Sequence, residues 1–257
     1  MKRTTKNLIL SAVLSTLAIS LNHAATYQWR GATSNVWTLA GNWASGSTNG
    51  QTIAAGPAPT NGTYAHRLNI NNQASNEAIY TSSQGTTIYN NGAGNRGLVI
   101  GSGATATGGG NGTLRITGGT FSTVGSNGGD LIGNNGNTAA LILDGGNYIG
   151  SSTLGMGLGP VTTATFTIGN GSEATTNAVN FNATTCNVNL NLGTLQLNQF
   201  TYQAGACSIN FDGGTLKARQ NNASFLADFA TTNVFIKSNG AIIDSNGFNI
   251  TIGEPLL

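Results

Sequence analysis

The sequence Leu141-Ile142-Leu143-Asp144-Gly145-Gly146-Asn147-Tyr148 holds the pattern that decides the fold, and the chain carries this pattern three times. The other copies are LRITGGTF at 114–121 and INFDGGTL at 209–216. Apolar residues two apart place their side chains on one face of a β-strand, and the glycine pair provides a bend. Each copy predicts a strand, a corner and the start of another strand. Such a unit cannot bury its apolar face alone, so we expect the copies to stack around one core.

The spacing of the copies and the turns between them indicate the fold class. The copies begin 27 and 68 residues apart, and coils of roughly 20 to 27 residues account for both intervals. Short alternating strands are predicted at 68–70, 79–80, 98–101, 130–133, 164–169 and 188–193. Nine Asn-Gly pairs supply turns. We predict an all-β chain that forms a β-solenoid, as a right-handed parallel β-helix. Because Asn-Gly turns also suit antiparallel hairpins, a β-sandwich of jelly-roll type is the alternative.

The first 24 residues predict a signal peptide and therefore export. Lys2, Arg3 and Lys6 precede an uncharged apolar run over 8–21, and small residues follow as a processing site. That run is shorter than the roughly 20 residues that a membrane-spanning helix needs. We expect the mature protein to be exported.

Residues 25–62 predict a cap followed by an irregular connection. Trp29, Trp37 and Trp43 lie within fifteen residues, and large aromatic side chains suit a lid over the last layer of a stacked core. The alternative is an aromatic platform on which sugar rings stack. The solenoid repeats then occupy 63–257. Within them, residues 222–230 predict one or two helical turns. Since no polar cap follows the strand over 248–252, we expect either a truncated chain with a missing C-terminal segment or a partner over that end.

Composition excludes some partners and leaves a disulfide open. Only 7% of the residues are charged, with 10 Lys and Arg against 8 Asp and Glu. Removing the three basic residues of the leader leaves 7 against 8, so neither nucleic acid nor an anionic membrane surface is an expected partner. An exported chain with two cysteines could pair Cys186 with Cys207 across about one repeat, and two buried thiols are the alternative.

Two stretches resemble exported β-solenoid proteins of Gram-negative bacteria that carry the autotransporter-associated β-strand repeat, a group overlapping PEP-CTERM proteins. Trp29-Arg30-Gly31, Trp37 and Asn42-Trp43 are similar to the start of such chains, and 141–148 and 240–251 are similar to their strand repeat. The resemblance implies a passenger-like rod displayed at the outer cell surface or in the extracellular matrix. Neither the membrane β-barrel nor the sorting tail of these families follows in this sequence. We expect membrane contact only through such a missing anchor or barrel.

Candidate catalytic groups are few. His66 is the only histidine after the leader, and it has no matching nucleophile elbow. Asp144 and Asp212 occupy one position in two repeats, with Arg115 a copy earlier. A glycoside hydrolase needs two carboxylates within about 5 to 9.5 Å, whereas we expect these two about three coils apart. The sequence therefore predicts no catalytic residue, no metal site and no cofactor.

Two weaker patterns suggest ligands. The stretch 128–131 faintly resembles a calcium-binding glycine-aspartate repeat, but it is not in tandem. A threonine row at Thr163, Thr165 and Thr167 is not repeated at the coil spacing, so an ice-binding face is not expected.

The function that these observations predict is display. We expect an exported structural or adhesive rod, with polar faces of Asn, Thr and Ser that offer hydrogen bonds to glycans or to cell-surface components. The alternative is a polysaccharide lyase or hydrolase, or a carbohydrate-binding module, built on a β-helix.

Overall fold

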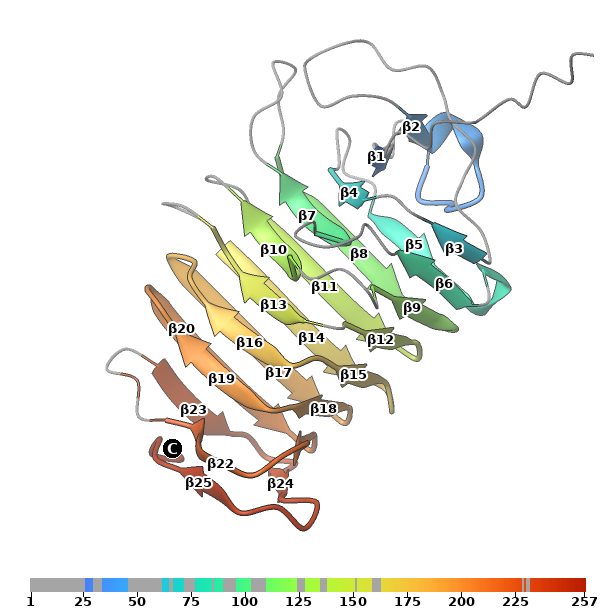
Figure 1. Cartoon of the computed structure of the whole chain (residues 1–257). Coiled ribbons are helices and arrows are strands. Elements are labelled where there is room, and N and C mark those ends of the chain that lie inside the picture. The colour runs from blue at the N-terminus through green and yellow to red at the C-terminus, as the bar shows by residue number, and fades with distance from the viewer. Residues whose placement is uncertain are drawn as a thin grey trace, which may run out of the picture.

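A computed structural model describes residues 26–29, 34–45, 62–64, 67–71, 77–84, 86–89, 96–102, 110–123, 128–134, 138–150, 152–158, 163–227, 229 and 232–257. The chain winds as a β-solenoid whose coils stack from the N-terminal end to the C-terminal end (Figure 1). The only helices within these ranges are two 3-10 turns, η1 (Ala40–Asn42) and η2 (Ser82–Gln84). No helix of the described residues is long and apolar enough to cross a membrane.

Three long sheets form the walls of the solenoid. Sheet A has the order β19-β16-β13-β10-β7-β4-β1-β2, sheet B the order β23-β20-β17-β14-β11-β8-β5, and sheet C the order β24-β21-β18-β15-β12-β9-β6-β3. In chain order, the strands of sheet A are β1 (Thr26–Trp29), β2 (Trp43–Ser45), β4 (Arg67–Ile70), β7 (Leu98–Ser102), β10 (Asp130–Asn134), β13 (Thr153–Met156), β16 (Ala178–Phe181) and β19 (Gln199–Tyr202). Those of sheet B are β5 (Ala78–Tyr80), β8 (Gly112–Ile116), β11 (Thr138–Asp144), β14 (Thr163–Gly169), β17 (Thr185–Asn191), β20 (Ala206–Asp212) and β23 (Thr232–Ile236).

Sheet C and a small fourth sheet complete the strands. Sheet C contains β3 (Gly62–Tyr64), β6 (Thr86–Tyr89), β9 (Thr120–Ser122), β12 (Asn147–Ile149), β15 (Glu173–Thr175), β18 (Thr194–Leu197), β21 (Thr215–Ala218) and β24 (Ile242–Asp244). The fourth sheet pairs β22 (Asn222–Leu226) with β25 (Ile250–Ile252). Each full coil passes through sheets A, B and C in turn.

The strand pairing confirms the predicted solenoid and rules out the sandwich. Every pair of described strands is parallel except β1 with β2, whereas a jelly roll is built from antiparallel pairs. In-register partners in sheet B, namely Leu141, Phe166, Val188 and Ile209, are 25, 22 and 21 residues apart. These three steps account for the 68-residue interval, since loops of different length separate strands of one register.

The core is a set of apolar columns that run along the solenoid. Leu114, Leu141, Phe166, Val188 and Ile209 are neighbours in register and are fully buried. The burial pattern of β14, β17 and β20 alternates along each strand, with inward residues buried and outward residues half-buried or exposed. Alternation therefore places one row of each strand in the core and the other row on the outer face.

The glycine pair of the repeat forms the corner between sheets B and C. Gly145 has a φ of 104°, a left-handed conformation that glycine adopts without strain. A Cβ atom on Gly146 would lie 2.4 Å from Ile116 Cγ2 in the coil below. The corner therefore needs glycine for both reasons, conformation and close contact between coils.

The three tryptophans close the N-terminal end of the core. Trp29 in β1, Trp37 and Trp43 in β2 are buried, and their ring centroids lie 4.6 to 6.1 Å apart. Trp43 Nε1 donates to the Trp37 carbonyl at 2.5 Å. The buried rings do not form an open platform on which sugars could stack, whereas the cap over 25–62 stays a prediction.

The helix predicted within 222–230 is wrong. Residues 222–226 form strand β22, which pairs with β25 through Asn222 N to the Asn249 carbonyl at 2.9 Å. Phe225 and Leu226 are both buried. Adjacent apolar residues suggested a helix, but the hydrogen bonds offered by the next coil decide for a strand, with an irregular register at this point.

Candidate functional site

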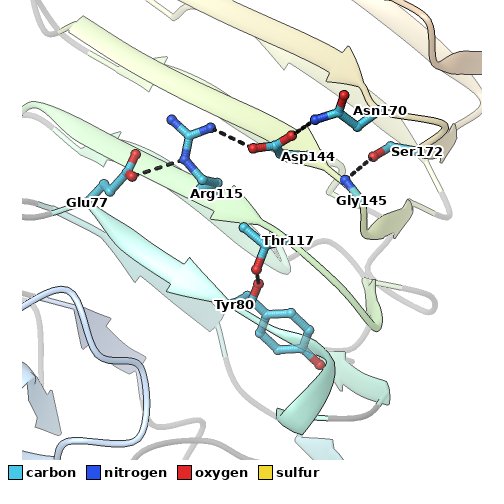
Figure 2. Close-up of polar contacts among 8 residues, drawn as sticks. All are labelled: Glu77, Tyr80, Arg115, Thr117, Asp144, Gly145, Asn170 and Ser172. Atoms are coloured by element: carbon cyan, nitrogen blue, oxygen red, sulfur yellow. Dashed lines mark hydrogen bonds and ion pairs between the residues drawn. The ribbon is translucent and has the colours of Figure 1, made fainter.

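On the outer face of sheet B, Arg115 and Asp144, which the sequence singled out, form a ladder with Glu77 across three coils. Arg115 of β8 donates from Nε to Glu77 Oε1 at 3.0 Å and from Nη1 to Asp144 Oδ2 at 3.4 Å (Figure 2). Glu77 directly precedes β5, and Asp144 ends β11. The hydrogen bond to Glu77 raises the pKa of the Arg115 guanidinium, with burial opposing it. The two carboxylates are therefore held on either side of one cation.

Asp144 and Asp212 both stabilise the corner of the following coil. The Asp144 carboxylate accepts a hydrogen bond from the Asn170 side chain, beside the contact of Gly145 N with Ser172 Oγ at 2.8 Å (Figure 2). The Asp212 carboxylate accepts from Asn239 Nδ2 at 2.7 Å. Asn170 has a φ of 48°, a left-handed conformation that an asparagine tolerates in a tight turn.

These two aspartates do not form a catalytic pair. They lie on β11 and β20, which are separated in sheet B by β14 and β17. Three steps of roughly 4.8 Å give a separation of roughly 14 Å, beyond the roughly 5 to 9.5 Å that glycoside hydrolysis requires. The prediction that they stand three coils apart is confirmed.

Next to the charged ladder, sheet B presents an array of amides and hydroxyls. Asn189 Nδ2 donates to Thr167 Oγ1 at 3.1 Å, and Asn210 Nδ2 donates to Asn189 Oδ1 at 3.0 Å. A second column joins Ser208 Oγ to Asn187 Oδ1 at 2.9 Å. We call eight of the outward residues of β14, β17 and β20 the polar face: Thr163, Thr165, Thr167, Thr185, Asn187, Asn189, Ser208 and Asn210.

The threonine row does recur in part. Thr163 lies in register between Thr138 of β11 and Thr185 of β17. The neighbouring columns instead continue from Thr165 to Asn187 and from Thr167 to Asn189. Unequal spacings of 25 and 22 residues between these in-register threonines had hidden the alignment in the sequence. The polar face is thus a mixed lattice of threonine and asparagine.

A buried carboxylate that the sequence did not predict lies between sheets C and A. Asp130 begins β10, and it accepts hydrogen bonds from Leu98 N at 2.8 Å and from the hydroxyls of Thr123 and Tyr148. Burial raises the pKa of Asp130 to about 6, although the three donors oppose that change. Burial and the Asp130 charge raise the pKa of Tyr148. The network joins the starts of β7 and β10 to strand β12.

The calcium resemblance at 128–131 is not supported by this geometry, because Asp130 is directed to protein donors. Among the described residues, no three His, Cys, Asp or Glu side chains are placed to hold a metal ion. His66 lies outside the described residues. In the sequence, only the Gly-Gly-Asp stretch drew attention to Asp130. The spacing of that stretch did not predict that the Asp130 carboxylate is buried.

Cys186 and Cys207 are in-register partners on β17 and β20 and are both buried free thiols. Their hydrogen bond, together with burial, raises the pKa of Cys207, and the same bond lowers the pKa of Cys186. Parallel neighbours place Cα atoms roughly 4.8 Å apart, within the roughly 4.4 to 6.8 Å of disulfides. The proposed bridge therefore stays a prediction with a suitable geometry.

Comparisons of the chain with models of known families, with curated proteins and with solved structures find no match.

Proposed function

We propose that this protein is an exported rod that holds glycans or other cell-surface components on its polar face, without transforming them. The observation that carries the proposal is the hydrogen-bonded lattice of hydroxyl and amide side chains on β14, β17 and β20. Its columns repeat at the inter-strand distance of about 4.8 Å. A ligand that runs along the rod would thus meet similar groups at each coil.

The lattice is suited to many weak contacts. Each asparagine amide carries two donors and an acceptor with two lone pairs, so an amide that bonds its neighbour keeps capacity for a ligand hydroxyl. Contacts between Asn189, Asn210 and Ser208 hold the side chains in place before a ligand arrives. Because little conformational freedom is then lost on binding, individually weak hydrogen bonds can add up along an extended ligand.

Export and surface display belong to the same proposal. The basic residues Lys2, Arg3 and Lys6 followed by the apolar run support a leader, and the Trp-rich start and strand repeats support a passenger-like rod of the autotransporter-repeat and PEP-CTERM type. Sequencing the N-terminus of the protein recovered from the medium or the outer membrane of producing cells tests this part. An N-terminus at Met1 would contradict it.

A second candidate, a polysaccharide lyase or hydrolase, rests on the carboxylates of Glu77 and Asp144 on either side of Arg115. Both carboxylates are engaged by the guanidinium on a half-exposed sheet face. We therefore favour binding, and we include turnover in the test.

The test measures retention of the mature protein on insoluble chitin, cellulose, peptidoglycan and alginate gel, and on cells of the producing bacterium. The double variant Asn189→Leu/Asn210→Leu removes two amides that are neighbours in register. Its matched control is Thr194→Leu/Thr215→Leu, which changes two outward neighbours in sheet C on the same coils. We expect the first variant alone to lose roughly tenfold in retention, since multivalent contacts weaken together.

Two results would overturn the proposal. One is the absence of retention on every matrix and on the cells. The other is release of oligosaccharide products by the wild-type protein that Asp144→Asn abolishes, which would establish the enzyme instead.

A further inference from the structure

A groove of about 290 Å³ crosses the outer face of sheet A, on a different wall from the polar face. Its floor is the outward row Leu131, Gly155 and Asn180, which are in-register neighbours on β10, β13 and β16. A Cβ atom on Gly155 would lie 3.2 Å from Leu131 Cδ1. The absent side chain of Gly155 therefore leaves a notch between a leucine and an asparagine.

The groove crosses sheet A obliquely, because Arg96 precedes its strand and Gln203 follows its own. Arg96 lines it just before β7, whereas Gln203 lines it just after β19. These two strands are four steps apart in sheet A, which corresponds to roughly 19 Å. An occupant that fills the groove must therefore be extended and must cross the strands, in contrast to a peptide that adds to a sheet edge parallel to them.

The chemistry of the groove changes from one end to the other. Asn180, Asn182 and Gln203 supply amide donors and acceptors at the C-terminal end. Leu131 lies beneath the middle of the groove and is only 2% exposed. Arg96 supplies a guanidinium at the N-terminal end; burial lowers the pKa of this group, and the charge of Asp130 opposes that change. Amides suit sugar hydroxyls, and a guanidinium forks onto a carboxylate.

We propose that this groove binds a linear acidic oligosaccharide, with a uronate carboxylate at Arg96 and further rings over the Gly155 notch and the three amides. This inference rests on the proposed glycan-binding function and adds to the polar face a second site on sheet A with its own ligand class.

The experiment uses fluorescence polarisation with the full mature chain and labelled hexasaccharides of polygalacturonate, with cellohexaose as the neutral probe. Arg96→Gln should weaken binding of the acidic probe by at least roughly tenfold and bring it to the affinity of the neutral one. Gly155→Gln, which fills the notch, should weaken both probes. Asn180→Asp keeps the side-chain size and should weaken only the acidic probe, through charge repulsion.

The control is Thr194→Leu/Thr215→Leu on the outward face of sheet C, and circular dichroism melts establish that each variant is folded. The inference is supported if the groove variants lose binding and this control keeps it. It is overturned if folded Arg96→Gln and Asn180→Asp bind polygalacturonate as the wild type does, or if polyglutamate competes as well as the sugar. If the groove variants bind both hexasaccharides as the wild type does while retention on polysaccharide matrices persists, the groove is overturned and the proposed function stands. No retention at all would overturn both.

Discussion

The two ends of the solenoid differ in how they cover the last layer of the core. At the N-terminal end, Trp29, Trp37 and Trp43 are at most 2% exposed, and β2 turns back antiparallel to β1. At the C-terminal end, Ile236 of β23 is 41% exposed, while its in-register neighbour Phe211 one coil inside is fully buried. The same inward position is therefore core or surface according to whether another layer lies over it.

The C-terminal end nevertheless continues the path of the solenoid. Residues 256–257 return to sheet B, where Leu257 N donates to the Val234 carbonyl and Ile236 N donates to the Leu257 carbonyl, both at 2.8 Å. Backbone pairing thus continues where the apolar cover does not. The comparison shows that hydrogen bonds define the path of a coil, whereas bulky side chains close the core.

The largest effect is expected from removing the cap. Trp43→Ala deletes a buried indole and its bond to the Trp37 carbonyl, so we expect a loss of about 3 to 5 kcal/mol in the free energy of unfolding. Urea denaturation followed by circular dichroism measures this loss. Trp43→Phe should retain most of the stability. Unchanged stability of Trp43→Ala would mean that the rings do not close the core.

A disulfide bridge between Cys186 and Cys207 would link two neighbouring coils near the C-terminal end of the solenoid. The closed loop of about 22 residues predicts a gain of about 3 kcal/mol on oxidation, through the smaller entropy of the unfolded chain. Denaturation of the oxidised and reduced protein measures the gain, with Cys186→Ala/Cys207→Ala as control. If mild oxidants leave both thiols titratable in the folded protein, the bridge is wrong.

The covered interior also contains a titratable group, Asp130. Its pKa is raised from 3.8 to about 6 on folding, so the folded state binds more protons between these values. This group therefore stabilises the fold fully below pH 3.8, and that contribution, as much as about 3 kcal/mol, disappears as the pH rises through 6. Asp130→Asn should flatten the difference in stability between pH 4 and pH 7. The prediction fails if the variant and wild type share one pH profile.

The smallest effect on the free energy of unfolding is expected at the C-terminal end of the solenoid. Ile236→Ala should cost at most about 1 kcal/mol because much of this side chain is already in water. The matched variant Phe211→Ala removes the in-register ring one layer inside and should cost at least about 3 kcal/mol. Equal losses in the two variants, measured by urea denaturation, would show that the C-terminal end is covered in solution.

Local alternation of apolar residues predicted strands correctly where each strand buries one face. The segments at 68–70, 98–101, 164–169 and 188–193 all lie in observed strands or their ends. Residues 222–226 were misassigned because Phe225 and Leu226 are adjacent and both buried, a pattern that the irregular pairing with β25 explains. Pairing partners far along the chain are invisible to a local pattern.

The candidate site depended on the register between coils, which the sequence indicated only in outline. Asp144 and Asp212 could be placed three coils apart because both precede a glycine pair. The contact of Arg115 with Glu77 could not be predicted, since 38 residues separate them and the loop between them has no fixed length from pattern alone. The same reason hid the column from Thr138 through Thr163 to Thr185.

The sequence by itself determined the solenoid, because a repeated unit of strand, corner and strand buries its apolar rows by stacking on further copies of the unit. It also determined that the corners would be glycine and that tryptophan would close one end. Only the tertiary structure decided which outward side chains become neighbours, which carboxylate is buried and where the Gly155 notch opens. These features arise when coils of unequal length are brought into register, and register is set by hydrogen bonds between residues distant in the chain.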